Sequence, residues 1–156
     1  MPRYWFTTHY PPLSDGRDTL HVYLQDKHRD AANGISTGDR VFIYEHLAGP
    51  DLRRDGEIIA RLHGKAAIVC EAKISTALYK RRMDGAREVY ADGRDANYAW
   101  VAETAERTTG RLPRLRVNAI MGYKPGNRFH GFNSGRGIKE LKPGIYQELL
   151  AAFLGR

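Results

Sequence analysis

The sequence has little cysteine, no long apolar run and no obvious export signal. Its single cysteine, Cys70, cannot form an intramolecular disulfide, and its apolar neighbours favour a small core residue over a nucleophile. No apolar stretch approaches the roughly 18–20 residues that a membrane span requires. The N-terminal residues Met-Pro-Arg-Tyr-Trp-Phe lack the basic, apolar and small-residue regions of a secretory signal. We therefore expect a cytoplasmic protein with no membrane partner.

The spacings that mark metal and nucleotide cofactor sites are also missing. The six histidines form no pair at metal-ligand spacing, and one cysteine cannot complete a zinc site. The segment Gly135-Arg-Gly-Ile-Lys139 does not have the G-x-x-x-x-G-K-[ST] spacing of a phosphate-binding loop, and no G-x-G-x-x-G follows a strand candidate. We expect neither a metal nor a cofactor.

Positive charge is concentrated in one part of the chain. The net charge is +7, and residues 107–142 hold nine lysines and arginines against one acidic residue, for a net charge of +8. The remainder has a net charge of −1. A cluster of one sign indicates a polyanion partner, so the sequence favours nucleic-acid binding. The alternatives are a basic surface that only aids solubility and a protein-interaction domain whose basic face meets an acidic partner.

Residues 38–46, Gly-Asp-Arg-Val-Phe-Ile-Tyr-Glu-His, join a turn to an unbroken apolar run and predict a strand buried on both faces. Side chains alternate along a strand, so Phe42, Tyr44 and His46 share one face. We expect one wall of a pocket there. Rings in central strands mostly fill cores, and this alternative applies to Tyr44 and to Trp5.

Four further strands are predicted at residues 3–9, 65–75, 98–107 and 115–121, from β-branched, aromatic or alternating patterns. Short helices are predicted within residues 19–33 and 78–89, and the apolar spacing of residues 145–154 predicts an amphipathic C-terminal helix. Residues 1–156 thus predict one domain, a β-rich α+β barrel or curved sheet of about five to six mainly antiparallel strands.

Residues 122–137 predict a loop that mixes cations, aromatic rings and amides with five glycines. Cations contact phosphates, rings stack on unpaired bases, and amides form hydrogen bonds with base edges. The pattern therefore favours a nucleic-acid contact. Alternatively, the loop places Phe129 and Phe132 in the core.

An enzymatic alternative comes from Pro50-Asp51 followed by Glu71-Ala72-Lys73. This pattern resembles the PD-(D/E)xK signature of nucleases, in which the two carboxylates hold Mg²⁺ and the lysine acts at the scissile phosphate. Glu71 and Lys73 would share the face of their strand that points away from the core. Asp51, however, lies in a turn-rich segment where that fold needs a strand. We therefore expect binding without catalysis.

The order and spacing of short motifs over nearly the whole chain resemble an EVE domain of the PUA-like superfamily, which also contains the YTH and ASCH domains. The matching motifs are Tyr4-Trp5-Phe6, Gly38-Asp39-x-Val41-Phe42-x-Tyr44, Gly64-x-Ala66-x-Ile68-Val69-x-Glu71-Ala72, and Phe129-x-Gly131-Phe132-Asn133-x-Gly135-x-Gly137-Ile138-x-x-Leu141, with Tyr146 in the closing helix. The resemblance implies a pseudo-barrel that holds an extruded, often modified base in an aromatic pocket. It also implies a role beside a separate nuclease partner, as in modification-dependent restriction, and makes Glu71 and Lys73 ordinary strand residues.

The residues and the resemblance together predict a site for a flipped, modified base, for example methylated or hydroxymethylated cytosine, in DNA or RNA. We expect the pocket between the ends of the first two strands. The base-binding candidates are Trp5, Thr8, His9, Tyr10, Tyr44, Phe132 and Asn133. The phosphate-binding candidates are Lys124, Arg128 and Arg136.

Overall fold

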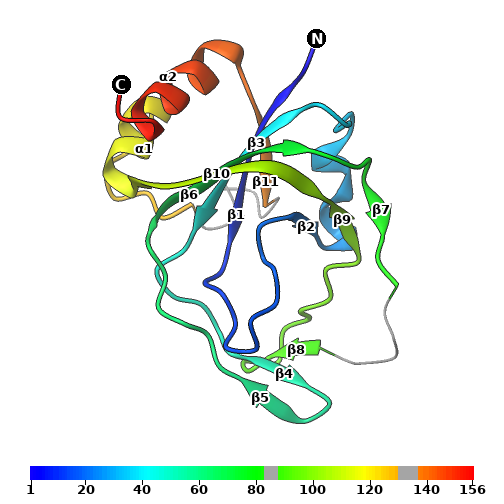
Figure 1. Ribbon diagram of the computed structural model, residues 1–156. Coiled ribbons are helices and arrows are strands. Elements are labelled where there is room, and N and C mark those ends of the chain that lie inside the picture. The colour runs from blue at the N-terminus through cyan, green and yellow to red at the C-terminus, as the bar shows by residue number, and fades with distance from the viewer. Residues whose placement is uncertain (83–87, 130–136) are drawn as a thin grey trace.

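A five-stranded sheet forms the centre of the protein in a computed structural model that describes residues 1–82, 88–129 and 137–156 (Figure 1). Its strands are β1 (Tyr4–His9), β3 (Arg40–Glu45), β6 (Ala67–Ile74), β10 (Thr104–Pro113) and β11 (Ile138–Leu141). Their order across the sheet is β10, β6, β3, β1, β11. Only β1 and β3 are parallel to each other among these neighbours. The carboxyl ends of β1 and β3 therefore lie side by side at one edge of the sheet.

Two three-stranded sheets complete the β structure of the described residues. One has the order β2 (Val22–Leu24), β9 (Trp100–Ala102), β7 (Tyr79–Lys80). The other has the order β5 (Glu57–Ile59), β4 (Leu52–Arg54), β8 (Glu88–Tyr90), and in Figure 1 it lies at the bottom of the molecule. Asp55 and Gly56 join β4 to β5 with positive φ angles of 50° and 85°, as a tight hairpin turn requires.

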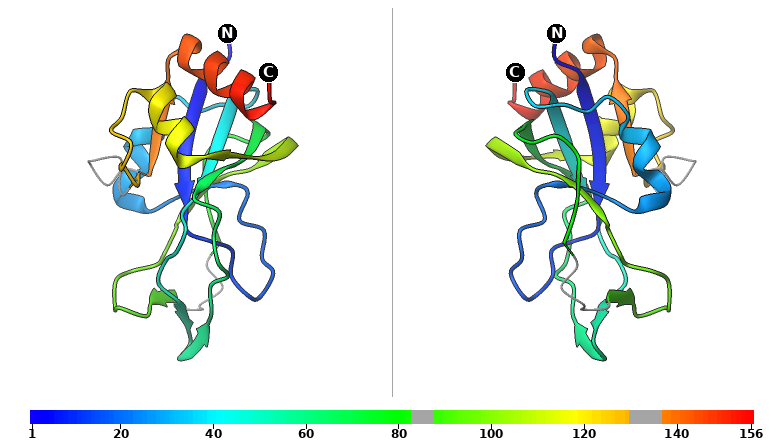
Figure 2. Two further views of the ribbon diagram at one scale, coloured as in Figure 1. Left: turned by 90° about the vertical axis from the view of Figure 1, so that its left-hand side faces the viewer. Right: turned by 90° about the vertical axis from the view of Figure 1, so that its right-hand side faces the viewer.

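Helices α1 (Arg114–Met121) and α2 (Pro143–Phe153) lie next to each other at the opposite end of the molecule from β4 and β5 (Figures 1 and 2). Pro143 stands at the start of α2, where its fixed φ suits a helix and its missing N–H costs nothing. A short 3₁₀ helix, η1 (Asp26–Ala32), follows β2. None of the described helices is long and apolar enough to cross a membrane.

Both faces of the large sheet are covered, and β3 shows this directly. Val41 and Ile43 pack into one apolar cluster with Trp5, while Phe42 and Tyr44 pack into a second cluster with residues of α1 and α2. These four β3 side chains are at most 1% exposed. The predicted strand, its burial on both faces and the C-terminal helix are confirmed, as is the β-rich α+β class.

The predicted strand at residues 115–121 is wrong, because these residues form helix α1. A strand would have buried Leu115 together with Val117, but Leu115 is 64% exposed while Val117 is fully buried. Val117, Ile120 and Met121 face the core with helical spacing. Gly122 then ends the helix in the left-handed conformation, with φ 76°.

The short helix predicted at residues 78–89 is also wrong for the part that the structure describes. Tyr79–Lys80 form β7, paired with β9, and Glu88–Tyr90 form β8, paired with β4. The strand predicted at residues 98–107 is divided into β9 and β10. Residues Ile138–Leu141 were placed in no predicted element, but they form β11 and pair with β1. Strands of two to four residues are too short to show an alternating pattern.

The alternation along β6 predicted that Glu71 lies in a solvent-facing row, and this prediction is wrong. It is 2% exposed, and its carboxylate accepts hydrogen bonds from the Arg40 guanidinium at 2.8 Å and from the Tyr146 hydroxyl of α2 at 2.9 Å. Burial of a carboxylate is tolerated when it is ion-paired and hydrogen-bonded. Glu71 therefore joins the sheet to α2.

Candidate nucleic-acid interface

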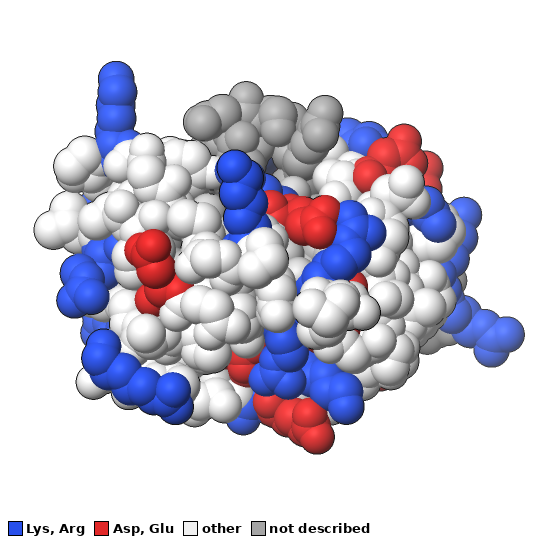
Figure 3. Space-filling model, turned by 90° about the horizontal axis from the view of Figure 1, so that it is seen from above, with Lys and Arg blue, Asp and Glu red and all other residues white. Residues whose placement is uncertain are grey.

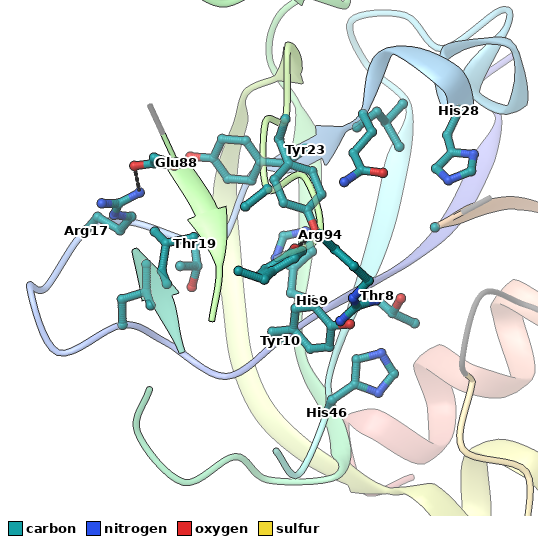
Figure 4. A pocket seen from close by; sticks show the side chains of 18 of the residues that line it. Thr8, His9, Tyr10, Arg17, Thr19, Tyr23, His28, His46, Glu88 and Arg94 are labelled. Atoms are coloured by element: carbon teal, nitrogen blue, oxygen red, sulfur yellow. Dashed lines mark hydrogen bonds and ion pairs between the residues drawn. The ribbon is translucent and has the colours of Figure 1, made fainter. Parts of the chain in front are cut away.

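A cavity of about 430 Å³ lies beyond the adjacent ends of β1 and β3 (Figure 4). Thr8 and His9 of β1 line it together with Tyr10, and His46 lines it directly after β3. Its remaining walls come from β2 and from segments around β4, β8 and β9, which are distant from β1 in the sequence. A volume of this size falls within the range of sites for small organic ligands.

Aromatic rings from several segments surround this cavity. The Tyr10 ring lies 5.7 Å from the His46 ring and meets the Tyr90 ring edge-on at 5.6 Å, between ring centroids. Across the cavity, the His9 and Tyr23 rings are 5.9 Å apart. The planar faces and hydroxyl tips of such rings can hold a flat heterocycle by stacking and by hydrogen bonds.

Five cationic side chains line the cavity, against two carboxylates. The cations are Arg17, Lys27, Arg61, Arg81 and Arg94, and the carboxylates are Asp18 and Glu88. Three of the guanidinium groups lie near tyrosine rings. Arg61 is 5.1 Å from the Tyr10 centroid, Arg94 is 5.1 Å from that of Tyr90, and Arg81 is 5.3 Å from that of Tyr23. The cavity thus combines stacking surfaces with positive charge.

His9 is a polar group held neutral inside this wall. Burial lowers its pKa to about 4, opposed by a hydrogen bond to the Thr19 backbone. Nε2 is buried and has no hydrogen-bond partner among the described residues. Tyr90 shows the same effect on a phenol, because burial, with Tyr98 beside it, raises its pKa, and the two hydroxyls are hydrogen-bonded. At neutral pH, His9, Tyr90 and Tyr98 are therefore uncharged.

Three of the predicted base-binding residues, Thr8, His9 and Tyr10, line the cavity. The prediction that Trp5 and Tyr44 form its walls is wrong. Each is 1% exposed within the core, where the Trp5 indole N–H donates to Asp39 at 2.9 Å and the Tyr44 ring packs on Phe129. Trp5 lies near the start of β1, away from the cavity, and Tyr44, although it is next to the last residue of β3, packs on the face of the sheet that α1 and α2 cover.

The structure describes only part of the loop of residues 122–137, which holds five of the predicted site residues. Phe132, Asn133 and Arg136 lie outside the described residues. Lys124 and Arg128 are exposed and are not among the residues that line the cavity. Phe129 is fully buried against Phe6, as the alternative interpretation of the loop predicted.

The predicted basic segment does not supply the positive charge of the cavity. None of its described lysines and arginines lines the cavity, whose cations come from residues 17–94. Arg107 instead pairs with Asp18 at 2.8 Å. Seen from above, Lys and Arg side chains lie at separate places around the molecule, with acidic groups between them (Figure 3). The single basic face expected from the sequence is therefore not seen in this view.

Sequence reasoning missed Tyr23, Arg61, Arg81, Tyr90 and Arg94. Averaging charge over long segments concealed these arginines, because acidic residues lie among them. One local signal was present, since Tyr90, Arg94 and Tyr98 alternate ring and cation at a spacing of four.

The nuclease candidates Asp51, Glu71 and Lys73 are not assembled into a metal site. Asp51 precedes β4 at the bottom of Figure 1, whereas Glu71 is bound to Tyr146 of α2 at the other end of the molecule. The described residues contain no group of three or more His, Cys, Asp or Glu side chains placed to hold a metal ion.

The segment Gly34-Ile-Ser-Thr-Gly38 has the G-x-S-x-G spacing of a hydrolase nucleophile but not its structural setting. Ser36 lies between η1 and β3, so a helix precedes it and a strand follows, which is the reverse of a nucleophile elbow. Its N–H donates to Asp39 at 3.0 Å within the turn before β3. The glycines serve this turn, in which both have positive φ.

The sequence matches no protein-family model and no curated protein. Solved structures share its fold. Protein Atu2648 from Agrobacterium tumefaciens is 13% identical, with a TM-score of 0.50 over 94% of this chain and 90% of that chain. Human THYN1, solved in complex with DNA that contains 5-methylcytosine, is 9% identical, with a TM-score of 0.51 over 96% of each chain. The chain has the PUA-like pseudo-barrel fold, as the resemblance to EVE domains predicted.

Proposed function

We propose that this chain binds nucleic acid and holds an extruded, modified base in the cavity beyond β1 and β3. Methylated or hydroxymethylated cytosine is the type of base expected. The observation that carries this proposal is a cavity of about 430 Å³ with tyrosine and histidine rings in its walls and five cations around it. Rings stack on any base, and cations attract the phosphates that accompany it.

The fold supports this proposal independently of the cavity. Human THYN1, which shares the fold over 96% of this chain, was solved with DNA that contains 5-methylcytosine. An extruded base leaves the duplex at a cost of a few kcal/mol, and stacking on aromatic side chains returns about 1–3 kcal/mol for each base. The half-buried rings of Tyr10 and Tyr23 line the cavity and are placed to supply this stacking.

Binding without catalysis is the form of the function that we propose. Glu71 has both carboxylate oxygens engaged by Arg40 and Tyr146, so it is not available to a metal ion in this arrangement. No arrangement among the described residues favours the nuclease alternative.

The test is a binding titration against matched oligonucleotides that differ only at one base. Cytosine, 5-methylcytosine, 5-hydroxymethylcytosine and methylated adenine are compared in DNA and in RNA, at about 50 mM and about 200 mM salt. We expect one modified base to bind at least about fivefold more tightly than its unmodified counterpart at both salt concentrations, since 1 kcal/mol corresponds to about that factor. Equal affinity for all of them would refute recognition of a modified base.

A further inference from the structure

The two carboxylates that line the cavity are already paired with cations. Glu88 forms an ion pair with Arg17 at 2.9 Å, and Asp18 forms one with Arg107 at 2.8 Å. Neither is then free to neutralise another cation of the cavity.

Three cavity cations remain without an acidic partner. Arg17 is paired as above, and Arg94 pairs with Asp92 at 2.8 Å. Lys27, Arg61 and Arg81 have no carboxylate within ion-pair distance among the described residues. The cavity therefore has an excess of positive charge that the protein itself does not neutralise.

Arg61 is the most firmly positioned of these three. Its Nη1 donates to the Pro11 carbonyl at 2.8 Å, and its Nε donates to the Pro50 carbonyl at 2.6 Å. The guanidinium lies 5.1 Å from the Tyr10 centroid and 6.0 Å from the Tyr90 centroid. These contacts hold its plane in one orientation without cancelling its charge, because carbonyl oxygens are neutral acceptors.

Donor groups of Arg61 remain unused. A guanidinium has five N–H donors, and Nη2 has no hydrogen-bond partner among the described residues. Burial lowers the pKa of Arg61, and the opposing charge effects of the neighbouring tyrosines and of Asp51 do not make up for the loss of water. A partly buried and unpaired cation costs free energy, and an anionic ligand would remove this cost.

We infer that Arg61 binds an oxyanion of the ligand that enters this cavity. The inference rests on the proposed function, because it takes the ligand to be a nucleotide. A planar guanidinium fork suits a phosphate or a carboxylate, and the flanking Tyr10 ring would contact the heterocycle attached to it. The oxyanion is either the phosphate of the extruded nucleotide or a carboxylate carried on the base.

Two pairs of ligands test whether the protein without substitutions binds an oxyanion, and they distinguish a nucleotide phosphate from a carboxylate on the base. The first pair is 5-methyl-2′-deoxycytidine and its 5′-monophosphate. The second pair is one oligonucleotide with either 5-methylcytosine or 5-carboxylcytosine. We expect the anionic member of one pair to bind at least about tenfold more tightly, as charge-assisted hydrogen bonds provide. The pair that shows this preference identifies the source. Equal affinities within both pairs would overturn the inference.

Variants at Arg61 test the residue itself, with Arg53→Gln as the matched control. Arg53 is an exposed arginine of β4 that does not line the cavity. We expect Arg61→Gln to reduce the preference for the anionic ligand over its uncharged counterpart to within about twofold. Arg61→Lys keeps the charge but loses the fork, so part of the preference should remain. A folded Arg61→Gln protein with the full preference of the unmodified chain would contradict the assignment.

The failure of this inference is distinguishable from failure of the proposed function. If the modified oligonucleotide is preferred over the unmodified one but both ligand pairs bind equally, the base-binding function stands and the Arg61 site does not. If no oligonucleotide distinguishes modified from unmodified base but the monophosphate is preferred over the nucleoside, the Arg61 site stands and modified-base recognition does not. If Arg61→Gln is unfolded by circular dichroism, the ligand pairs on the unmodified chain decide.

Discussion

His9, at the end of β1, illustrates how the surroundings of a single side chain determine its pKa. Burial lowers its pKa to about 4, so it is neutral at physiological pH and becomes charged only at a cost to the folded state. In the unfolded chain it takes up a proton near pH 6.5. Between these two values the unfolded chain binds more protons than the folded one, so stability falls as the pH is lowered.

We therefore predict a pH dependence of stability that His9→Gln reduces. The stabilising effect of a neutral His9 is complete above about pH 6.5 and is lost as the pH falls towards about 4, by at most about 3 kcal/mol. Urea denaturation at about pH 7 and about pH 4 measures the change in free energy of unfolding. The control is His63→Gln, at an exposed position. If His9→Gln loses as much stability between about pH 7 and about pH 4 as the protein without the substitution, the burial of His9 is contradicted.

At the scale of secondary structure, a buried polar contact joins α2 to the large sheet. Tyr146 donates to Glu71 at 2.9 Å, and burial raises the pKa of Tyr146 to about 12, so the phenol stays protonated and remains a donor. Glu71 is in turn paired with Arg40 of β3. The helix is thus positioned by one directional contact in addition to its apolar face.

Tyr146→Phe should lower the free energy of unfolding by about 1–2 kcal/mol, the cost of leaving part of a buried carboxylate without its hydrogen bond. Tyr4→Phe is the control, since Tyr4 stacks on Tyr146 with 4.1 Å between centroids but its hydroxyl makes no hydrogen bond among the described residues. Urea denaturation measures both. A smaller loss for Tyr146→Phe than for Tyr4→Phe would show that the contact with Glu71 contributes nothing.

The elements that could be predicted from the sequence are those with a strong local pattern. β1, β3, β6 and α2 are long and apolar, and their periodicity was sufficient. The alternation of Leu115 and Val117 was equally compatible with a strand, and only packing against α2 and β10 selects the helix. The burial of Glu71 depended on Tyr146, 75 residues away in the chain, which no local pattern indicates.

The candidate site was predictable only where β1 and β3 end, and His46, on the predicted pocket wall, lines the cavity directly after β3. Thr8, His9 and Tyr10 follow from the end of the first strand, as polar and aromatic residues ahead of Pro11. The opposite walls are brought together by tertiary contacts between short strands such as β4 and β8. Trp5 and Tyr44 were assigned to the site by residue type, although their position within central strands places them in the core.

At the scale of the whole molecule, the net charge and the charge around the cavity come from different parts of the chain. The net charge of +7 favours association with a polyanion. The cations that line the cavity nevertheless come from a part of the chain that is nearly neutral on average. The local balance within the cavity is therefore a better guide to the ligand than the charge of long segments.

Base recognition by the Tyr10 side of the cavity is the central claim, and the most direct measurement of it is the affinity ratio between modified and unmodified oligonucleotide in Tyr10→Ala. Fluorescence anisotropy with the best modified base and its counterpart gives this ratio. The matched control is Tyr79→Ala, a ring that is 43% exposed and does not line the cavity. We predict that Tyr10→Ala brings the ratio close to 1, because the base is no longer held against the ring, while Tyr79→Ala leaves the ratio unchanged. The loss of about 1–3 kcal/mol of stacking should also lower the affinity for the modified oligonucleotide about five- to 150-fold. A ratio that survives the loss of the Tyr10 ring in a folded protein would contradict the account.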